Sequence, residues 1–172
     1  MMRAMLDIET LAVTEDALVT AVGICLFNEA EVVRTDCITL DITADTEGHI
    51  DPATIRWWLT QDTQVFRDMM TGTVKPGEAL DWIDERLHGR QVWANGPQFD
   101  CTILRNWIFR QGGTCPWNFR DERDMRTMYA LGRTLGVEYP VIETRAHDAG
   151  ADAYRQALHL LQIEAKVREL AA

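Results

Sequence analysis

The segment Asp7-Ile8-Glu9-Thr10, near the start of the chain, places two carboxylates one residue apart at the end of an apolar run. In a β-strand, the side chains of residues i and i+2 project from the same face, so Asp7 and Glu9 would point together. Two adjacent negative charges repel each other, which is tolerated at a wet surface or where a cation lies between them. By itself the segment fits either a solvated strand end or a metal site.

Two further acids stand where they could complete such a site. Asp100 begins an expected helix, across a polar turn from a short apolar strand, and Asp152 lies in the first turns of the expected C-terminal helix, five residues after His147. Five residues of regular helix rotate a side chain by about 500°, so His147 and Asp152 would converge only if His147 lies in the loop before the helix. An acid could then hold a metal ion while the imidazole takes a proton from water.

The elements that must position these residues follow an α/β order. Alternating or β-rich apolar runs predict strands, the first three forming a meander, at residues 5–9, 18–27, 31–40 and 91–94. Helical spacing and caps predict helices within residues 51–61, 63–70, 76–89, 99–113 and 152–170. On the last helix, one apolar stripe is expected from Tyr154, Leu158, Leu161 and Ala165. The fold class is therefore α/β, with a mixed β-sheet flanked by α-helices.

Composition narrows the class of protein. The 172 residues are 47% hydrophobic and 26% charged and contain no repeat or linker, so one domain over residues 1–172 is expected. The net charge of −10 argues against a module that binds nucleic acid by phosphate neutralisation alone, although bound cations could offset an acidic cluster. The four scattered cysteines form no C-x-x-C pair, and neither a membrane span nor a secretory signal is evident. A reduced, cytoplasmic protein with no membrane partner is expected.

Three motifs together carry a resemblance to a known family. DIET, NGPQFD and HDAGAD resemble, in order and spacing, the three motifs of the DEDD superfamily of 3′-5′ exonucleases, in the branch with histidine in the last motif (DEDDh, DnaQ-like). With IRWWLTQ and RDMRT, the likeness covers residues 5–162 and is closest to the phage and bacterial exonuclease VIII-like group that includes a mycobacterial 3′-5′ exoribonuclease. The resemblance implies an RNase H-like fold.

The resemblance also implies a metal-dependent phosphodiesterase with two divalent ions, Mg²⁺ or Mn²⁺. Asp7 would bridge both ions, Glu9 and Asp152 would hold the ion that activates water, and Asp100 would serve the second ion. His147 would be the general base. Two ions about 4 Å apart can stabilise both the attacking and the leaving oxygen of an in-line displacement. The other three histidines are expected at the surface, or, for His159, as a structural residue.

Substrate contacts are expected from residues around these motifs. Leu11 would wedge against the terminal base, as an apolar residue does in similar exonucleases, or be simply buried. Trp57 and Trp58 cannot both face the core of one helix, and Trp58 is the one expected to be exposed enough to stack on a base. Arg105 is among four arginines near the expected site and would contact phosphate. The full set of expected substrate-binding residues is Thr10, Leu11, Trp58, Phe99 and Arg105.

Three functions remain open from the sequence. The leading one is a 3′-5′ exonuclease acting on the 3′ ends of single-stranded DNA or RNA, because the acidic loop at residues 41–51 disfavours a long duplex track. A nuclease restricted to very short RNA, as in oligoribonucleases, is the related alternative. A catalytically silent RNase H-like binding domain is disfavoured, because such a domain has no physical reason to keep mutually repelling carboxylates together. The mycobacterial relative's group makes a homodimer an expectation.

Overall fold

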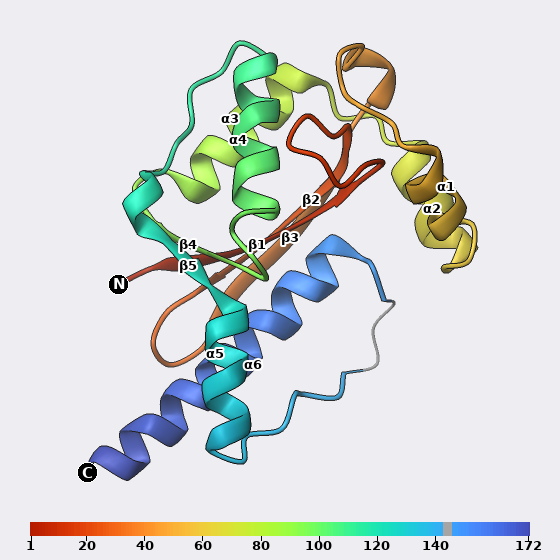
Figure 1. Cartoon of the computed structure of the whole chain (residues 1–172). Coiled ribbons are helices and arrows are strands. Elements are labelled where there is room, and N and C mark those ends of the chain that lie inside the picture. Colours follow the sequence, from red (N-terminus) through yellow and green to blue (C-terminus); the bar gives the residue numbers. More distant parts are fainter. Residues whose placement is uncertain (143–145) are drawn as a thin grey trace.

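Five strands form one mixed sheet at the centre of the computed structural model, which describes residues 1–142 and 146–172 (Figure 1). The strands lie in the order β3-β2-β1-β4-β5. β1 pairs antiparallel with β2 and parallel with β4, while β2 pairs antiparallel with β3 and β4 pairs parallel with β5. Their bounds are β1 Arg3–Thr10, β2 Val19–Phe27, β3 Val32–Thr39, β4 Gln91–Ala94 and β5 Glu122–Asp124.

Helices lie on both faces of this sheet, with α3 and α4 on one face, α5 and α6 on the other, and α1 and α2 beyond one end (Figure 1). Their bounds are α1 Pro52–Trp58, α2 Thr63–Met70, α3 Pro76–Leu87, α4 Asp100–Arg110, α5 Met125–Thr134 and α6 Ala149–Ala171. Several starts follow directly from capping: Asp51 accepts from the N–H of Ala53, and Asp124 accepts from those of Arg126 and Thr127. The expected α/β class and mixed sheet are confirmed.

The alternation of β1 sends its side chains into two apolar clusters, one on each face of the sheet. Ala4, Leu6 and Ile8 join the cluster that includes residues of α3 and α4. Met5, from the opposite face, packs in a second cluster with residues of α5 and α6. Since Asp7 and Glu9 share the parity of Met5, their side chains project from the face that α6 covers. The C-terminal end of β1 and the first turns of α6 therefore meet at the acids.

Close backbone contact brings α6 to this place. A Cβ at Gly23, the residue of β2 paired with Asp7, would lie 2.1 Å from the carbonyl carbon and oxygen of Ala149. A Cβ at Gly150 would lie 2.9 Å from the Cβ of Cys37 in β3. Both contacts need glycine, so the N-terminus of α6 rests almost on the sheet.

Two expectations about the elements need correction. The short strand β5 was not foreseen, because three residues with charged side chains carry no alternating apolar pattern. Of the expected apolar stripe on α6, only Leu161 is buried; the helix instead turns Ala153, Ala157 and Leu160 inward. Small side chains are what a helix needs when it lies this close to a sheet. Among the described helices, none is both long and apolar enough to span a membrane.

Candidate active site

All five predicted catalytic residues line one cavity of about 310 Å³ at the junction of β1, α4 and α6. They come from three distant parts of the sequence, and the structure brings every one of them together: Asp7, Glu9, Asp100, His147 and Asp152. Asn95, Phe99, Arg126, Tyr139 and Gln156 complete much of the wall.

Asp100 reaches the site from the first turn of α4. Its Oδ1 accepts a hydrogen bond of 3.3 Å from the backbone N–H of Ile8, the residue between Asp7 and Glu9. Strand β4 runs parallel to β1, so the turn after β4 emerges beside the end of β1 and delivers the start of α4 there. Asp100 is almost completely buried. This bond fixes a third carboxyl group beside the two on the strand.

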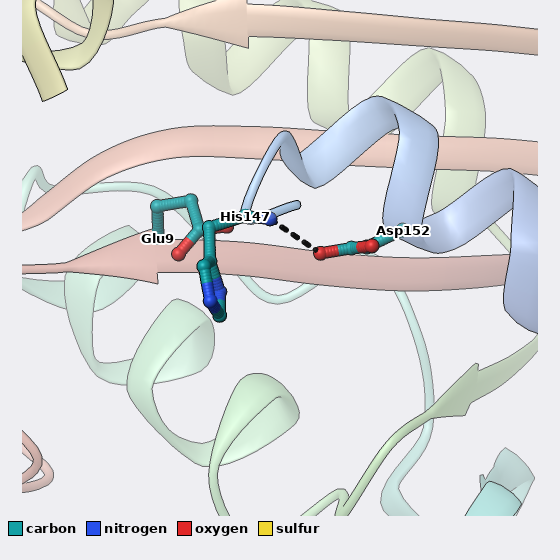
Figure 2. A group of neighbouring side chains, drawn as sticks. All are labelled: Glu9, His147 and Asp152. Carbon is teal, nitrogen blue, oxygen red and sulfur yellow. Dashed lines mark hydrogen bonds between the residues drawn. The ribbon is translucent and has the colours of Figure 1, made fainter. Parts of the chain in front are cut away.

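His147 and Asp152 converge because the turn before α6 has an unusual conformation. His147 has a φ of 61°, in the left-handed region that few residues other than glycine adopt, and its backbone N–H donates to Oδ2 of Asp152 at 3.1 Å. Asp148 then caps α6 by accepting from the N–H of Ala151. In Figure 2, His147 lies between Glu9 and Asp152, and one potential ligand atom from each of the three lies within 4.8 Å of the others.

Basic and amide side chains of α6 contact two of the acids. Arg155 forms an ion pair with Asp152, three residues earlier on the helix. Gln156 donates from Nε2 to Oδ1 of Asp7 at 2.7 Å. Neither residue is among those that the sequence predicted for the site. Their spacing could have revealed them, because residues three and four positions after Asp152 lie on nearly the same helix face.

Burial dominates the electrostatics of the carboxyl groups. It raises the pKa of Asp7 well above the ordinary value, with the neighbouring charge of Asp100 adding to the effect. Burial, followed by the charge of Asp7, raises the pKa of Glu9 to about 10, and burial raises that of Asp100 to about 7. Such carboxyl groups hold protons unless a cation is present to favour their ionised forms. For His147, burial and then the charge of Arg155 lower the pKa, which keeps the imidazole neutral at neutral pH.

The donor set fits a hard divalent cation. Carboxylate oxygens are the ligands that Mg²⁺ and Mn²⁺ prefer, and an imidazole beside them is compatible with Mn²⁺. Glu9, His147 and Asp152 already offer ligand atoms at mutual distances that one ion could bridge. Asp7 and Asp100 line the same cavity and could serve a second ion.

The expected roles of Trp58 and Leu11 need correction, because both side chains are only 1% exposed. Trp58 packs in a cluster with Leu11, and its indole Nε1 donates to the carbonyl oxygen of Thr10 at 2.9 Å. Their neighbours are exposed instead: Trp57 is 44% and Val13 is 70% exposed. The helix rotation that directs Trp58 inward turns Trp57 outward, and the chain leaves the core directly after Ala12.

A second cavity of about 500 Å³ adjoins the acids and is mostly apolar in its lining. Thr10 and Phe99, both expected to bind substrate, line it together with Val13, Trp57 and Glu9. The Trp57 ring meets the His147 imidazole edge-on, with their centroids 4.8 Å apart. Glu9 and Phe99 line both cavities, so the apolar space opens beside the acidic one.

Arg105 does not line the acidic cavity. Its guanidinium forms an ion pair with Glu122 and lies 5.7 Å from the ring centre of Trp117, which ties α4 to β5. Among residues 1–142 and 146–172, Arg126 is the one arginine or lysine in the cavity wall, and its side chain makes no hydrogen bond or ion pair with that part of the chain. Arg126, and not Arg105, therefore lies where a side chain could contact a phosphate in this cavity.

Comparisons with known proteins agree with the resemblance seen in the motifs. The sequence profile of the 3′-5′ exoribonuclease Rv2179c-like domain matches residues 2–164. No curated protein matches the chain.

Solved structures of exonuclease I share the fold. The zinc-bound complex of Escherichia coli exonuclease I with single-stranded DNA aligns over 98% of this chain and 41% of that one, with a TM-score of 0.74 and 15% identity. The complex of that enzyme with a dT13 oligonucleotide gives a TM-score of 0.72 at 15% identity, over 98% of this chain and 42% of the other. Exonuclease I of Methylocaldum szegediense gives 0.63 at 16% identity, over 94% and 40%. The chain thus spans about two fifths of these proteins and has their RNase H-like fold.

Proposed function

Because the chain belongs to the family of 3′-5′ exoribonuclease Rv2179c-like domains, we propose that it is a metal-dependent exonuclease that removes nucleotides from the 3′ end of single-stranded nucleic acid. The observation that carries the proposal is the convergence of four acids and His147, from three separate segments, in one cavity. The exonuclease I structures with single-stranded DNA lend it further support.

The carboxylates would hold two divalent ions. Asp7 would bridge them, Glu9 and Asp152 would hold one, and Asp100 would hold the other. When bound, such ions polarise the phosphate, lower the pKa of the attacking water and stabilise the leaving oxygen. The raised pKa values of Asp7, Glu9 and Asp100 support this assignment, because the three acids are held together at an electrostatic cost that cations would remove.

His147 would act as the general base. A base must be unprotonated before it accepts a proton, and the lowered pKa of His147 favours that state at neutral pH. Its left-handed backbone conformation holds the imidazole beside Glu9 and Asp152, where water attacking the phosphate would stand. Residues other than glycine adopt this conformation only where the surrounding structure imposes it.

The apolar cavity beside the acids would receive the 3′-terminal nucleoside. Exposed aromatic rings bind the faces of unpaired bases, and Trp57 is such a ring at this position. Phe99 lies at the boundary between the two cavities, so a base beside Trp57 would direct its phosphate toward the acids.

A gel assay tests the proposal directly. The substrates are 5′-labelled DNA and RNA of the same sequence, each as a 20-mer and as a dinucleotide, incubated with Mn²⁺, Mg²⁺ or chelator. We expect a ladder that shortens from the 3′ end only when metal is present, and no ladder with Asp7→Asn. The substrate that is cleaved faster, DNA or RNA, identifies the substrate class.

Other results would point to other functions. Cleavage of the dinucleotide alone would indicate an oligoribonuclease-like enzyme. Metal binding without cleavage of any substrate would indicate a silent binding domain, and equal cleavage in chelator would contradict the metal-dependent mechanism.

A further inference from the structure

Helix α6 runs alongside β1 so that two polar pairs join them. At one end, Nη2 of Arg3 donates to Oε2 of Glu164 at 2.9 Å, and nearer the acids Nε2 of Gln156 donates to Oδ1 of Asp7 at 2.7 Å. Four strand residues cover about 13 Å and eight helix residues about 12 Å, so the two elements stay in register between these pairs. The geometry of α6 therefore sets Gln156 opposite Asp7.

Gln156 is buried at a cost that, among the described residues, Asp7 alone offsets. The residue is 3% exposed. Its Oε1 is buried without a hydrogen-bond partner in the described part of the chain, and its Nε2 bonds only to Asp7 there. A buried amide that lacks one of its partners is less favourable for folding than an apolar side chain of the same size. Stability of the core is therefore a poor explanation for a glutamine at this position.

We propose that Gln156 is a positioning residue that orients the Asp7 carboxylate for divalent-cation binding. The proposal rests on the metal-dependent function given above. Asp7 is half-buried, and Gln156 is the one side chain that donates a hydrogen bond to it among the described residues. By engaging Oδ1, the amide fixes the rotation of the carboxylate and leaves Oδ2 free of any hydrogen bond to described residues. Loss of such a supporting hydrogen bond typically weakens metal binding about 10- to 100-fold.

The test is Gln156→Met, which keeps the length and approximate volume of the side chain and removes the amide oxygen and nitrogen. Gln162→Met is the matched control, because Gln162 lies exposed on the same helix. Mn²⁺ binding is measured calorimetrically on the metal-free full chain without nucleic acid, together with the thermal midpoint of that chain. We expect Gln156→Met to bind Mn²⁺ about 10- to 100-fold more weakly, with an equal or higher metal-free midpoint, and the control to match the wild type.

A second readout uses cleavage. The Mn²⁺ concentration for half-maximal activity should rise by the same factor in Gln156→Met, while saturating Mn²⁺ restores most of the rate. Should Gln156→Met fail to fold, Gln156→Leu replaces it in both measurements.

Unchanged Mn²⁺ affinity in the variant would overturn the inference alone, while the proposed function stands. A lower metal-free midpoint in that case would mark Gln156 as a purely structural residue. If the wild type itself bound no divalent cation, the proposed function would fail and the inference with it.

Discussion

The backbone N–H of His147 donates to Oδ2 of Asp152 at 3.1 Å while His147 holds a φ of 61°. This one bond closes the turn ahead of α6 and explains how two residues five positions apart reach the same cavity. A regular helix through both would have separated them by more than a quarter turn. The carboxylate thus has a structural task, closing the turn, in addition to its proposed task as a metal ligand.

Replacing His147 by asparagine should separate catalysis from folding. Asparagine tolerates the left-handed region better than most residues, so His147→Asn should retain the turn and the far-ultraviolet circular dichroism spectrum. Loss of a general base should lower the single-turnover cleavage rate at pH 7 by about 10²- to 10⁴-fold. His88→Asn, at the exposed histidine that directly follows α3, is the control. Wild-type rates in His147→Asn would assign the base to another group.

The metal-free protein should lose stability as the pH rises, in part through Asp100. Burial raises its pKa from 3.8 to about 7 in the folded state, so between these values the folded protein binds a proton that the unfolded chain releases. The stabilisation is fully present below pH 3.8 and is lost as the pH rises through about 7.

Asp100→Asn cannot ionise, and its side-chain oxygen can still accept from the N–H of Ile8. Its thermal midpoint, relative to that of the wild type, should therefore increase from pH 4 to pH 7 in chelator, and added Mn²⁺ should stabilise the wild type more than the variant. Asp81→Asn, exposed on α3, should show no such trend. A difference between Asp100→Asn and wild type that stays constant with pH would contradict the raised pKa.

Truncation of Trp57 should weaken substrate binding, whereas truncation of the adjacent Trp58 should lower the stability of the fold. Trp57→Ala removes an exposed ring of the apolar cavity, so KM should rise roughly 5- to 150-fold, the equivalent of about 1–3 kcal/mol of stacking, with little change in the thermal midpoint. Trp58→Ala removes a buried ring and its hydrogen bond to Thr10, and should cost about 3–5 kcal/mol of unfolding free energy. Equal stability losses in the two variants, measured by urea denaturation, would contradict the assigned orientations.

Gly23 should be required for activity although it lies on β2, outside the catalytic motifs. In Gly23→Ala the new methyl group would lie 2.1 Å from backbone atoms of Ala149, so the start of α6 must move away from the sheet and take His147 and Asp152 with it. We expect cleavage and Mn²⁺ affinity to fall together. Gly77→Ala, in the first turn of α3 with open space around it, should leave activity unchanged and stability equal or slightly higher. Normal metal binding in Gly23→Ala would show that the helix tolerates the shift.

Much of the protein was readable from local patterns. The strand of Asp7 and Glu9, the meander, and the helices that begin near residues 51 and 100 follow from capping residues and apolar periodicity, which act over a few residues. That His147 lies in the loop before α6 was the condition for its convergence with Asp152, and the structure meets it. The choice of catalytic residues followed from motif order, and the structure places all five of them in one cavity.

Other features were decided only by tertiary contacts. Whether Trp57 or Trp58 faces outward depends on how α1 is rotated against the end of the sheet, and the inward turn of Ala153 and Ala157 depends on how closely α6 approaches the sheet. The pairing of Gln156 with Asp7 joins residues 149 positions apart. Local sequence fixes which residues form a helix or strand because those hydrogen bonds are short-range. It leaves open which side chains meet across the fold, because that depends on the packing of elements that are distant in the chain.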